Sequence, residues 1–245
     1  MTTTASTLPR QAAVFHFHTT RWSRVCLAKT DSVDGQQALA DLCEAYYEPV
    51  LAFLRCELQD AEAARDLSHA FFAEILEGGA IQAAAPERGR FRSYLLGAVK
   101  HFTSHHREHA RRMKRGAGLA TVTLDSDEAL GFPDAAQRSP DAVFDRQWAI
   151  TVLARGLAAL RAQCEAERRI PFFELVKPLL TGDALHGAQG ELAIRCGMSL
   201  PAFRMAVHRL KKQLRLKVHA EVAGTLEDPA MVQQEMQALY AALAG

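Results

Sequence analysis

Basic side chains gather in two segments of this 245-residue chain, although its 29 Lys and Arg nearly balance its 28 Asp and Glu. Residues 86–116 hold nine basic residues against two acidic ones, and residues 199–219 hold six basic residues and no acidic one. Guanidinium and ammonium groups at this density bind phosphates, so each segment is a candidate for contact with nucleic acid. The rest of the chain carries a net charge of −12, which the overall net charge of +1 conceals.

The segment after Ser199 has the spacing of an amphipathic helix with one apolar and one basic row, at about 100° per residue. Gly197 predicts a turn with positive φ, and Ser199 predicts an N-cap. A short helix over 189–196, this turn and the basic helix therefore form a predicted helix-turn-helix, whose second helix lies in the DNA major groove. The residues assigned to DNA binding here are Ser199, Arg204, His208, Lys211, Lys212 and Arg215.

The first basic segment predicts a helix over 89–112 with an apolar stripe that includes Phe91 and Phe102. Tyr94 lies at the edge of that stripe, where its ring could stack on an unpaired base. The basic side chains are expected on an outward sector. The residues assigned to nucleic acid in this helix are Arg92, Tyr94, Lys100, Arg107, Arg111 and Lys114.

Three histidines in the same helix, His101, His105 and His109, recur every four residues and could present imidazoles on one face as metal ligands. No second ligand set accompanies them, and Glu108 is the only nearby candidate for a general base. A metal-dependent helical enzyme is therefore a remote alternative. A further interpretation is that these histidines add positive charge to the helix at low pH. We assign no catalytic residue, no metal and no cofactor.

Helical periodicity runs through most of the chain, and no series of alternating β-branched runs marks a sheet, so we predict an all-α fold. Asp34 is the predicted N-cap of the first long helix. Turn formers and acidic residues between the two basic segments predict a flexible linker between two helical domains. The predicted divisions are a flexible N-terminus over 1–18, a first domain over 19–114, a linker over 115–140, a second domain with the helix-turn-helix over 141–222 and a helical tail over 223–245.

The five cysteines are scattered without metal-binding or disulfide spacing, which favours a reducing compartment. No apolar run reaches the roughly 18 to 20 residues that span a bilayer. We therefore expect a cytoplasmic protein that does not contact a membrane.

In their order along the chain, these segments resemble the extracytoplasmic-function group of bacterial RNA polymerase sigma factors. The resemblance covers about residues 20–220, and the tail after Asp228-Pro229 is similar to one found in a branch of that group. The motifs that carry it are Asp66-Leu67-Ser68-His69-Ala70-Phe71-Phe72, Arg88-Gly89-Arg90-Phe91-Arg92-Ser93-Tyr94-Leu95-Leu96, Glu191-Leu192-Ala193 with Gly197-Met198-Ser199, and Val207-His208-Arg209-Leu210-Lys211-Lys212.

The resemblance implies a non-catalytic subunit that binds core RNA polymerase and directs it to promoter DNA, with an anti-sigma factor as a further partner. It assigns the helix from Phe91 to Arg112 to the minus-ten element and the segment from Ser199 to Arg215 to the minus-thirty-five element. His69 and Ala70 stand where the family usually has Gln and an acidic residue, which leaves open a helix-turn-helix regulator that binds DNA without polymerase. The residues it assigns to polymerase binding are Asp66, Leu67, His69, Phe71 and Phe72.

Overall fold

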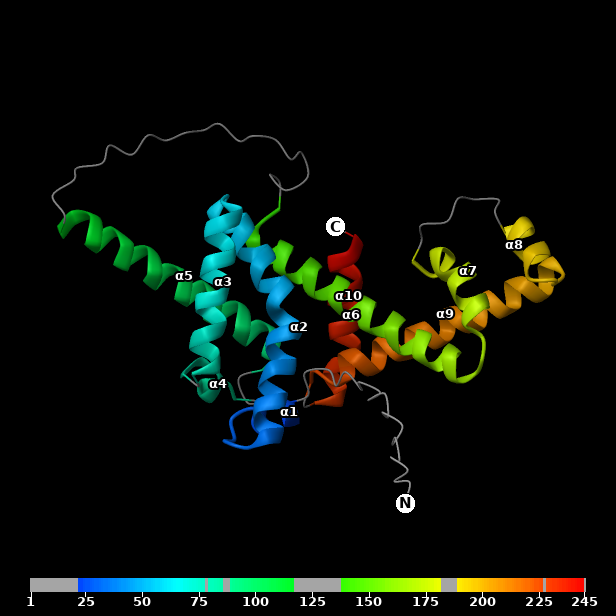
Figure 1. Cartoon of the computed structure of the whole chain (residues 1–245), viewed down its shortest axis with the longest axis horizontal. Helices are drawn as coiled ribbons and strands as arrows, with labels where there is room; N and C mark the ends of the chain where they lie inside the picture. Colours follow the sequence, from blue (N-terminus) through cyan, green and yellow to red (C-terminus); the bar gives the residue numbers. More distant parts are fainter. Residues whose placement is uncertain are drawn as a thin grey trace, which may run out of the picture.

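The computed structural model describes residues 22–77, 79–85, 89–116, 138–181, 189–226 and 228–244, and every regular element within them is helical. The predicted all-α fold is confirmed for these residues. The predicted N-terminal segment 1–18 and residues 117–137 of the predicted linker lie outside them. The elements are α1 (Trp22–Leu27), α2 (Val33–Leu58), α3 (Ala61–Leu76), α4 (Gly79–Ala83), α5 (Phe91–Gly116), α6 (Pro140–Ala166), α7 (Ile170–Thr181), α8 (Gln189–Arg195), α9 (Leu200–Ala223), the 3-10 turn η2 (Pro229–Met231) and α10 (Val232–Ala244) (Figure 1).

The start of α2 corrects the predicted N-cap. Ser32, not Asp34, caps this helix, because Ser32 Oγ accepts a hydrogen bond of 3.0 Å from the Gly35 N–H. Asp34 lies in the first turn, where its negative charge complements the helix dipole. The helix continues through Pro49, as the periodicity predicts. The short helices α1 and α4 were not predicted, because five or six residues show too little periodicity.

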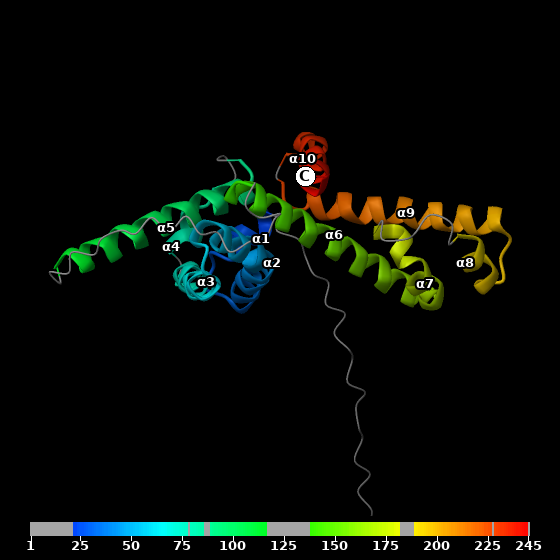
Figure 2. The same cartoon turned by 90° about the horizontal axis from the view of Figure 1, so that it is seen from above.

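Helix α6 connects the two halves of the molecule. It packs along α2 near its start, and farther along it packs on α9 and α7 (Figures 1 and 2). The buried residues of both predicted domains consequently belong to one hydrophobic core, which runs from Phe71 in α3 through Trp148 in α6 to Leu210 in α9. The prediction of two helical domains joined only by a flexible linker is therefore not confirmed.

The described helices form an elongated body with its candidate nucleic-acid helices at opposite ends. The far end of α5 projects at one end, and α7, α8 and the start of α9 form the other (Figure 2). Between them α10 lies against α6 and α9. None of the helices in the described ranges is long and apolar enough to cross a membrane.

The close contact of α6 with α9 leads to a stability prediction. A methyl group at Gly156 would lie 2.7 Å from Val218 Cγ2 and 3.3 Å from the Val218 backbone nitrogen. Gly156→Ala should therefore push the helices apart and lower the free energy of unfolding by about 1–3 kcal/mol. Gly97 has no neighbour within 4 Å of an added Cβ, so the control Gly97→Ala should raise it by about 0.5–1 kcal/mol. Urea unfolding measures both, and a Gly156→Ala protein as stable as the parent would contradict the contact.

Candidate nucleic-acid interface

A capped turn fixes where α9 begins. Gly197 has φ +63°, in the left-handed region that glycine adopts without strain. This conformation lets the Met198 N–H donate 2.9 Å back to the Ala193 carbonyl, which closes the end of α8. Ser199 Oγ then accepts from the Ala202 N–H at 3.4 Å and caps α9. Two helices thus meet at a four-residue turn, with Ala193 buried between them.

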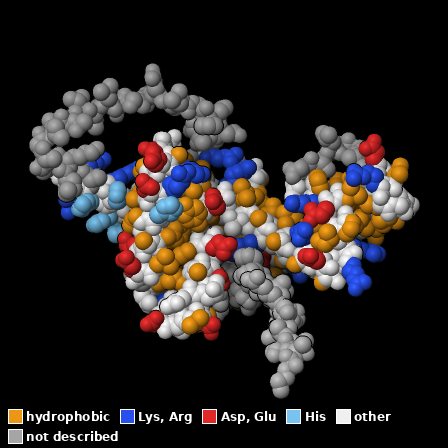
Figure 3. Space-filling view, viewed as in Figure 1, with side chains coloured by type: hydrophobic (Ala, Val, Ile, Leu, Met, Phe, Trp, Pro, Cys, Tyr) orange, Lys and Arg blue, Asp and Glu red, His pale blue; other side chains and the backbone are white. Residues whose placement is uncertain are grey.

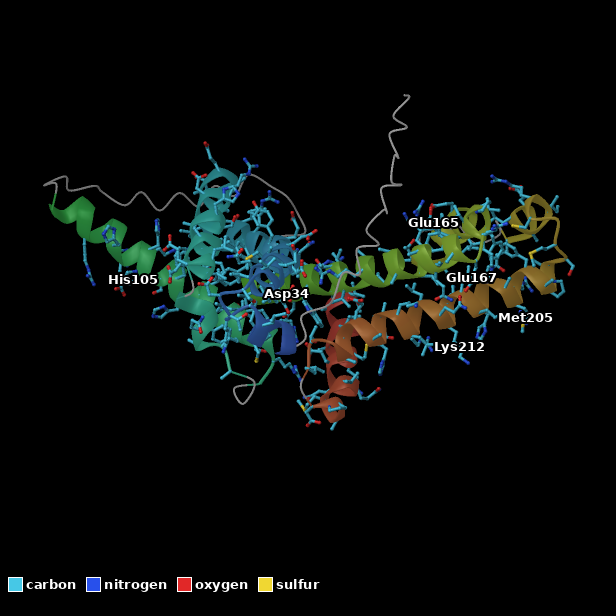
Figure 4. All side chains as sticks on the ribbon, turned by 60° about the horizontal axis from the view of Figure 1, so that its bottom comes forward. Asp34, His105, Glu165, Glu167, Met205 and Lys212 are labelled. Atoms are coloured by element: carbon cyan, nitrogen blue, oxygen red, sulfur yellow. The ribbon has the colours of Figure 1, made fainter. Side chains whose placement is uncertain are left out.

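The two faces of α9 separate as the spacing predicts. On the inner face, Phe203 and Leu210 are fully buried. On the outer face, Met205 and Lys212 lie on the side that faces away from α6 and α7 (Figure 4). Every side chain predicted for the basic row is exposed, namely Arg204, His208, Lys211, Lys212 and Arg215.

The basic row of α9, defined by these five residues, is open to solvent. Arg204 Nε donates to Gln189 Oε1 at 3.2 Å, a neutral partner that leaves its charge uncompensated. Among the residues that the structure describes, no carboxylate lies within ion-pair distance of Lys211, Lys212 or Arg215. This surface is therefore available to an anionic partner.

Helix α5 differs, because its basic side chains meet carboxylates of other helices. Lys100 Nζ lies 2.6 Å from Asp141 Oδ2 of α6, and Arg107 Nη1 lies 2.6 Å from Glu57 Oε1 of α2. These pairs are partly exposed, so each contributes about 0–1 kcal/mol and exchanges readily. Arg111 is exposed, and the side chain of Lys114 is outside the described part.

The prediction that Arg92 lies on the exposed sector of α5 is wrong. Its side chain is 8 % exposed and lies 4.2 Å above the ring of Trp148 in α6. Its Nε and Nη2 lie 3.0 and 3.1 Å from the Glu235 carboxylate of α10, and its Nη1 contacts Asp145. The periodicity of α5 cannot reveal this burial, because two helices distant in sequence cover the first turn of α5.

Tyr94 lies at the edge of the apolar stripe, as predicted. Its ring is half-buried, with its centroid 6.1 Å from that of Phe91. Phe91 and Leu95 are buried in the core, and Phe102 is half-buried against it. Tyr94 is therefore an aromatic side chain of α5 that stands between the core and the surface.

The residues assigned to polymerase binding divide between core and surface. Leu67, Phe71 and Phe72 are buried, because α3 turns them toward α2 and α5. Asp66 and His69 are exposed on α3. The structure thus leaves only part of this set available to a partner.

An apolar groove of about 600 Å³ lies between α2 and α3. His69 stacks on Tyr47 with ring centroids 5.9 Å apart, and its Nε2 lies 3.0 Å from the Tyr47 hydroxyl. Leu76 is 54 % exposed at the groove. Figure 3 shows hydrophobic side chains gathered over these two helices. The sequence pattern missed Tyr47 and Leu76, since the groove exists only once two helices pack.

The three histidines His101, His105 and His109 are exposed on α5, and Figure 3 shows histidine side chains over that end of the molecule. Within the described ranges, no group of three His, Cys, Asp or Glu side chains is placed to hold a metal ion.

A reactivity prediction follows from Cys43, which lines the α2–α3 groove. Burial raises the pKa of its thiol to about 11. Because the thiolate is the reactive form, Cys43 should react with iodoacetamide at pH 8 at least about tenfold more slowly than the exposed Cys26. Its rate should climb as the pH approaches 11 and the thiolate fraction grows. Mass spectrometry of labelled peptides measures both rates, and equal rates at pH 8 would contradict the partly buried position of Cys43.

Comparison with known proteins gives no relative: no protein-family model matches the chain, and searches of curated proteins and of solved structures give no significant match. The candidate interface is therefore defined by its own geometry. It consists of the exposed basic row of α9, the partly covered basic residues of α5 and the α2–α3 groove.

Proposed function

We propose that this chain is a sigma factor, which binds core RNA polymerase, directs it to promoter DNA and initiates transcription there. The observation that carries the proposal is the exposed basic row of α9, which follows directly on a capped turn. The order of its motifs supports the same function, because it resembles the extracytoplasmic-function group over about residues 20–220. In this proposal the chain is a cytoplasmic, non-catalytic subunit without a cofactor, and the chemistry belongs to the polymerase.

In the proposal, α8, the turn at Gly197 and α9 form a helix-turn-helix that reads duplex DNA. The width of an α-helix with its side chains, about 10–12 Å, matches a major groove of about 12 Å. We assign donation to guanine edges to Arg204 and Lys211, and phosphate contacts to the neighbouring cations. Ser199 at the start of α9 places the free N–H groups of the helix near a phosphate.

We assign contact with the minus-ten element to helix α5. Capture of a melted strand needs cations along the backbone and an aromatic ring for a base. Lys100, Arg107, Arg111 and Lys114 are the proposed phosphate contacts, and Tyr94 is the proposed stacking residue. The carboxylates that now pair with Lys100 and Arg107 are exchanged for phosphates when DNA binds.

The α2–α3 groove is the proposed polymerase contact. An apolar groove of this kind accepts the apolar face of a helix; it is lined by the exposed Leu76 and by the largely buried ring of Phe72. Glu44 and Glu48 at the groove favour a partner with basic residues beside its apolar face. The exposed Asp66 adds a further acidic contact on α3.

The second candidate is a helix-turn-helix regulator that binds DNA without polymerase. The ring of His69 favours it, because it is held by Tyr47 at a position where the family usually has a different residue. Size-exclusion chromatography with core polymerase, followed by transcription from a genomic library, separates the two. The sigma proposal predicts co-elution and transcripts that begin at defined promoters. DNA binding without co-elution and without such transcripts would contradict it and support the regulator.

The basic row of α9 gives a prediction for promoter choice. Arg204→Ala or Lys211→Ala should cost about 1–3 kcal/mol of discrimination between a selected promoter and one altered in its upstream element, if each side chain contacts a base edge. Lys177→Ala removes another exposed positive charge, from α7, and should leave discrimination unchanged. Competitive transcription from the two promoters measures this discrimination for each variant. Unchanged discrimination in both α9 variants would contradict the assignment of this face.

A further inference from the structure

A carboxylate lies on the apolar face of α10. Glu235 is 1 % exposed and sits beside Val232 and Met236, which are also buried. Its Oε2 lies 2.9 Å from Arg90 Nη1, and Arg92 meets both of its oxygens, at 3.0 and 3.1 Å. A buried carboxylate needs such partners, because water no longer solvates it. Helix α10 is thus held by two arginines, Arg92 in the first turn of α5 and Arg90 directly before that helix.

Helix α6 adds acidic groups to the same face of α5. Asp145 contacts Arg92, and Asp141 pairs with Lys100 at 2.6 Å. The indole of Trp148 lies under the Arg92 guanidinium. Acidic residues of α6 and α10 therefore pair with Arg92 and Lys100 in the first half of α5. No carboxylate of the described residues pairs with the basic row of α9 in this way.

The docked position of α10 depends on these contacts. A helix of 13 residues is marginal by itself in water, so its stability comes from packing. Val232, Met236 and Leu239 provide the apolar part of that packing, and Arg146 of α6 donates to the Leu243 carbonyl at 3.3 Å. Loss of the Glu235 pairing would leave this short helix with its apolar anchors and the single Arg146 contact.

We propose that α10 is an autoinhibitory latch: Glu235, together with Asp145 and Asp141, occupies in the free protein the cationic groups of α5 that DNA phosphates take. The latch rests on the proposed DNA contact of α5 and adds its regulation. Carboxylate and phosphate use the same guanidinium donors, so they compete. By linkage, DNA at α5 weakens the docking of α10 to the same degree that α10 weakens DNA binding. Arg92 and Arg90 become DNA contacts only when the latch is open.

The test measures the affinity of the full chain for DNA. The probe is a fluorescein-labelled duplex of mixed sequence with an unpaired central bubble, followed by anisotropy over a series of salt concentrations. Glu235→Gln keeps the shape of the side chain and removes its charge. We expect it to bind about tenfold more tightly, because the competent state becomes the main one. The salt dependence should steepen by about one to two units as Arg90 and Arg92 gain phosphates.

Two controls identify the cause of the gain. Glu62→Gln removes one negative charge from the exposed first turn of α3 and should leave affinity and salt dependence unchanged. Adding Arg92→Ala to Glu235→Gln should abolish most of the gain, since it removes a group that the open latch releases. A gain that survives Arg92→Ala in full would contradict the latch, because general loosening would then explain it.

A second variant keeps the test valid where Glu235→Gln does not fold, as circular dichroism would show. Asp145→Asn alters a carboxylate that is 39 % exposed, and it should tighten binding about threefold. Unchanged affinity in the folded variants overturns the latch. Failure of the parent chain to bind core polymerase, with the gain in DNA affinity present, overturns the sigma proposal and leaves the latch standing.

Discussion

A buried carboxylate must keep its cationic partners, and in this chain that requirement ties three helices together. Glu235 of α10 is held by Arg90, which directly precedes α5, and by Arg92 of α5, and Arg92 is shared with Asp145 and Trp148 of α6. Removing one partner of such a pair costs about 3–5 kcal/mol, because the charge left behind is not solvated. The docked position of α10 and the cover over the start of α5 therefore depend on one another.

The same ion pairs make the two basic helices differ in how freely their charges can bind an anionic partner. The basic row of α9 carries charges without carboxylate partners in the described residues, while Arg92, Lys100 and Arg107 of α5 are paired. In the proposed function, α9 meets duplex DNA first, since its surface is already free. Contact at α5 follows only after its ion pairs exchange. Such an order would limit indiscriminate binding by the free protein, which a net charge of +1 also disfavours.

Local pattern was enough to predict most helices, the two faces of α9 and the turn at Gly197, because those features depend on neighbours within about one helical turn. It placed the cap of α2 at Asp34 rather than Ser32, since either residue type can cap. It misplaced Arg92, whose partner Glu235 lies 143 residues away. A sign of that pair was present in the sequence. Glu235 stands among Val232, Met236 and Leu239 on an apolar stripe, where a lone carboxylate indicates a buried cation nearby.

Hydrogen exchange of the full chain, with and without core RNA polymerase, tests the sigma account most directly. The account predicts that polymerase increases amide protection along α2 and α3, where the groove is covered, and that promoter DNA in the complex then decreases protection in α10 and increases it in α9. Unchanged protection of α2 and α3 in the presence of saturating polymerase would contradict the account.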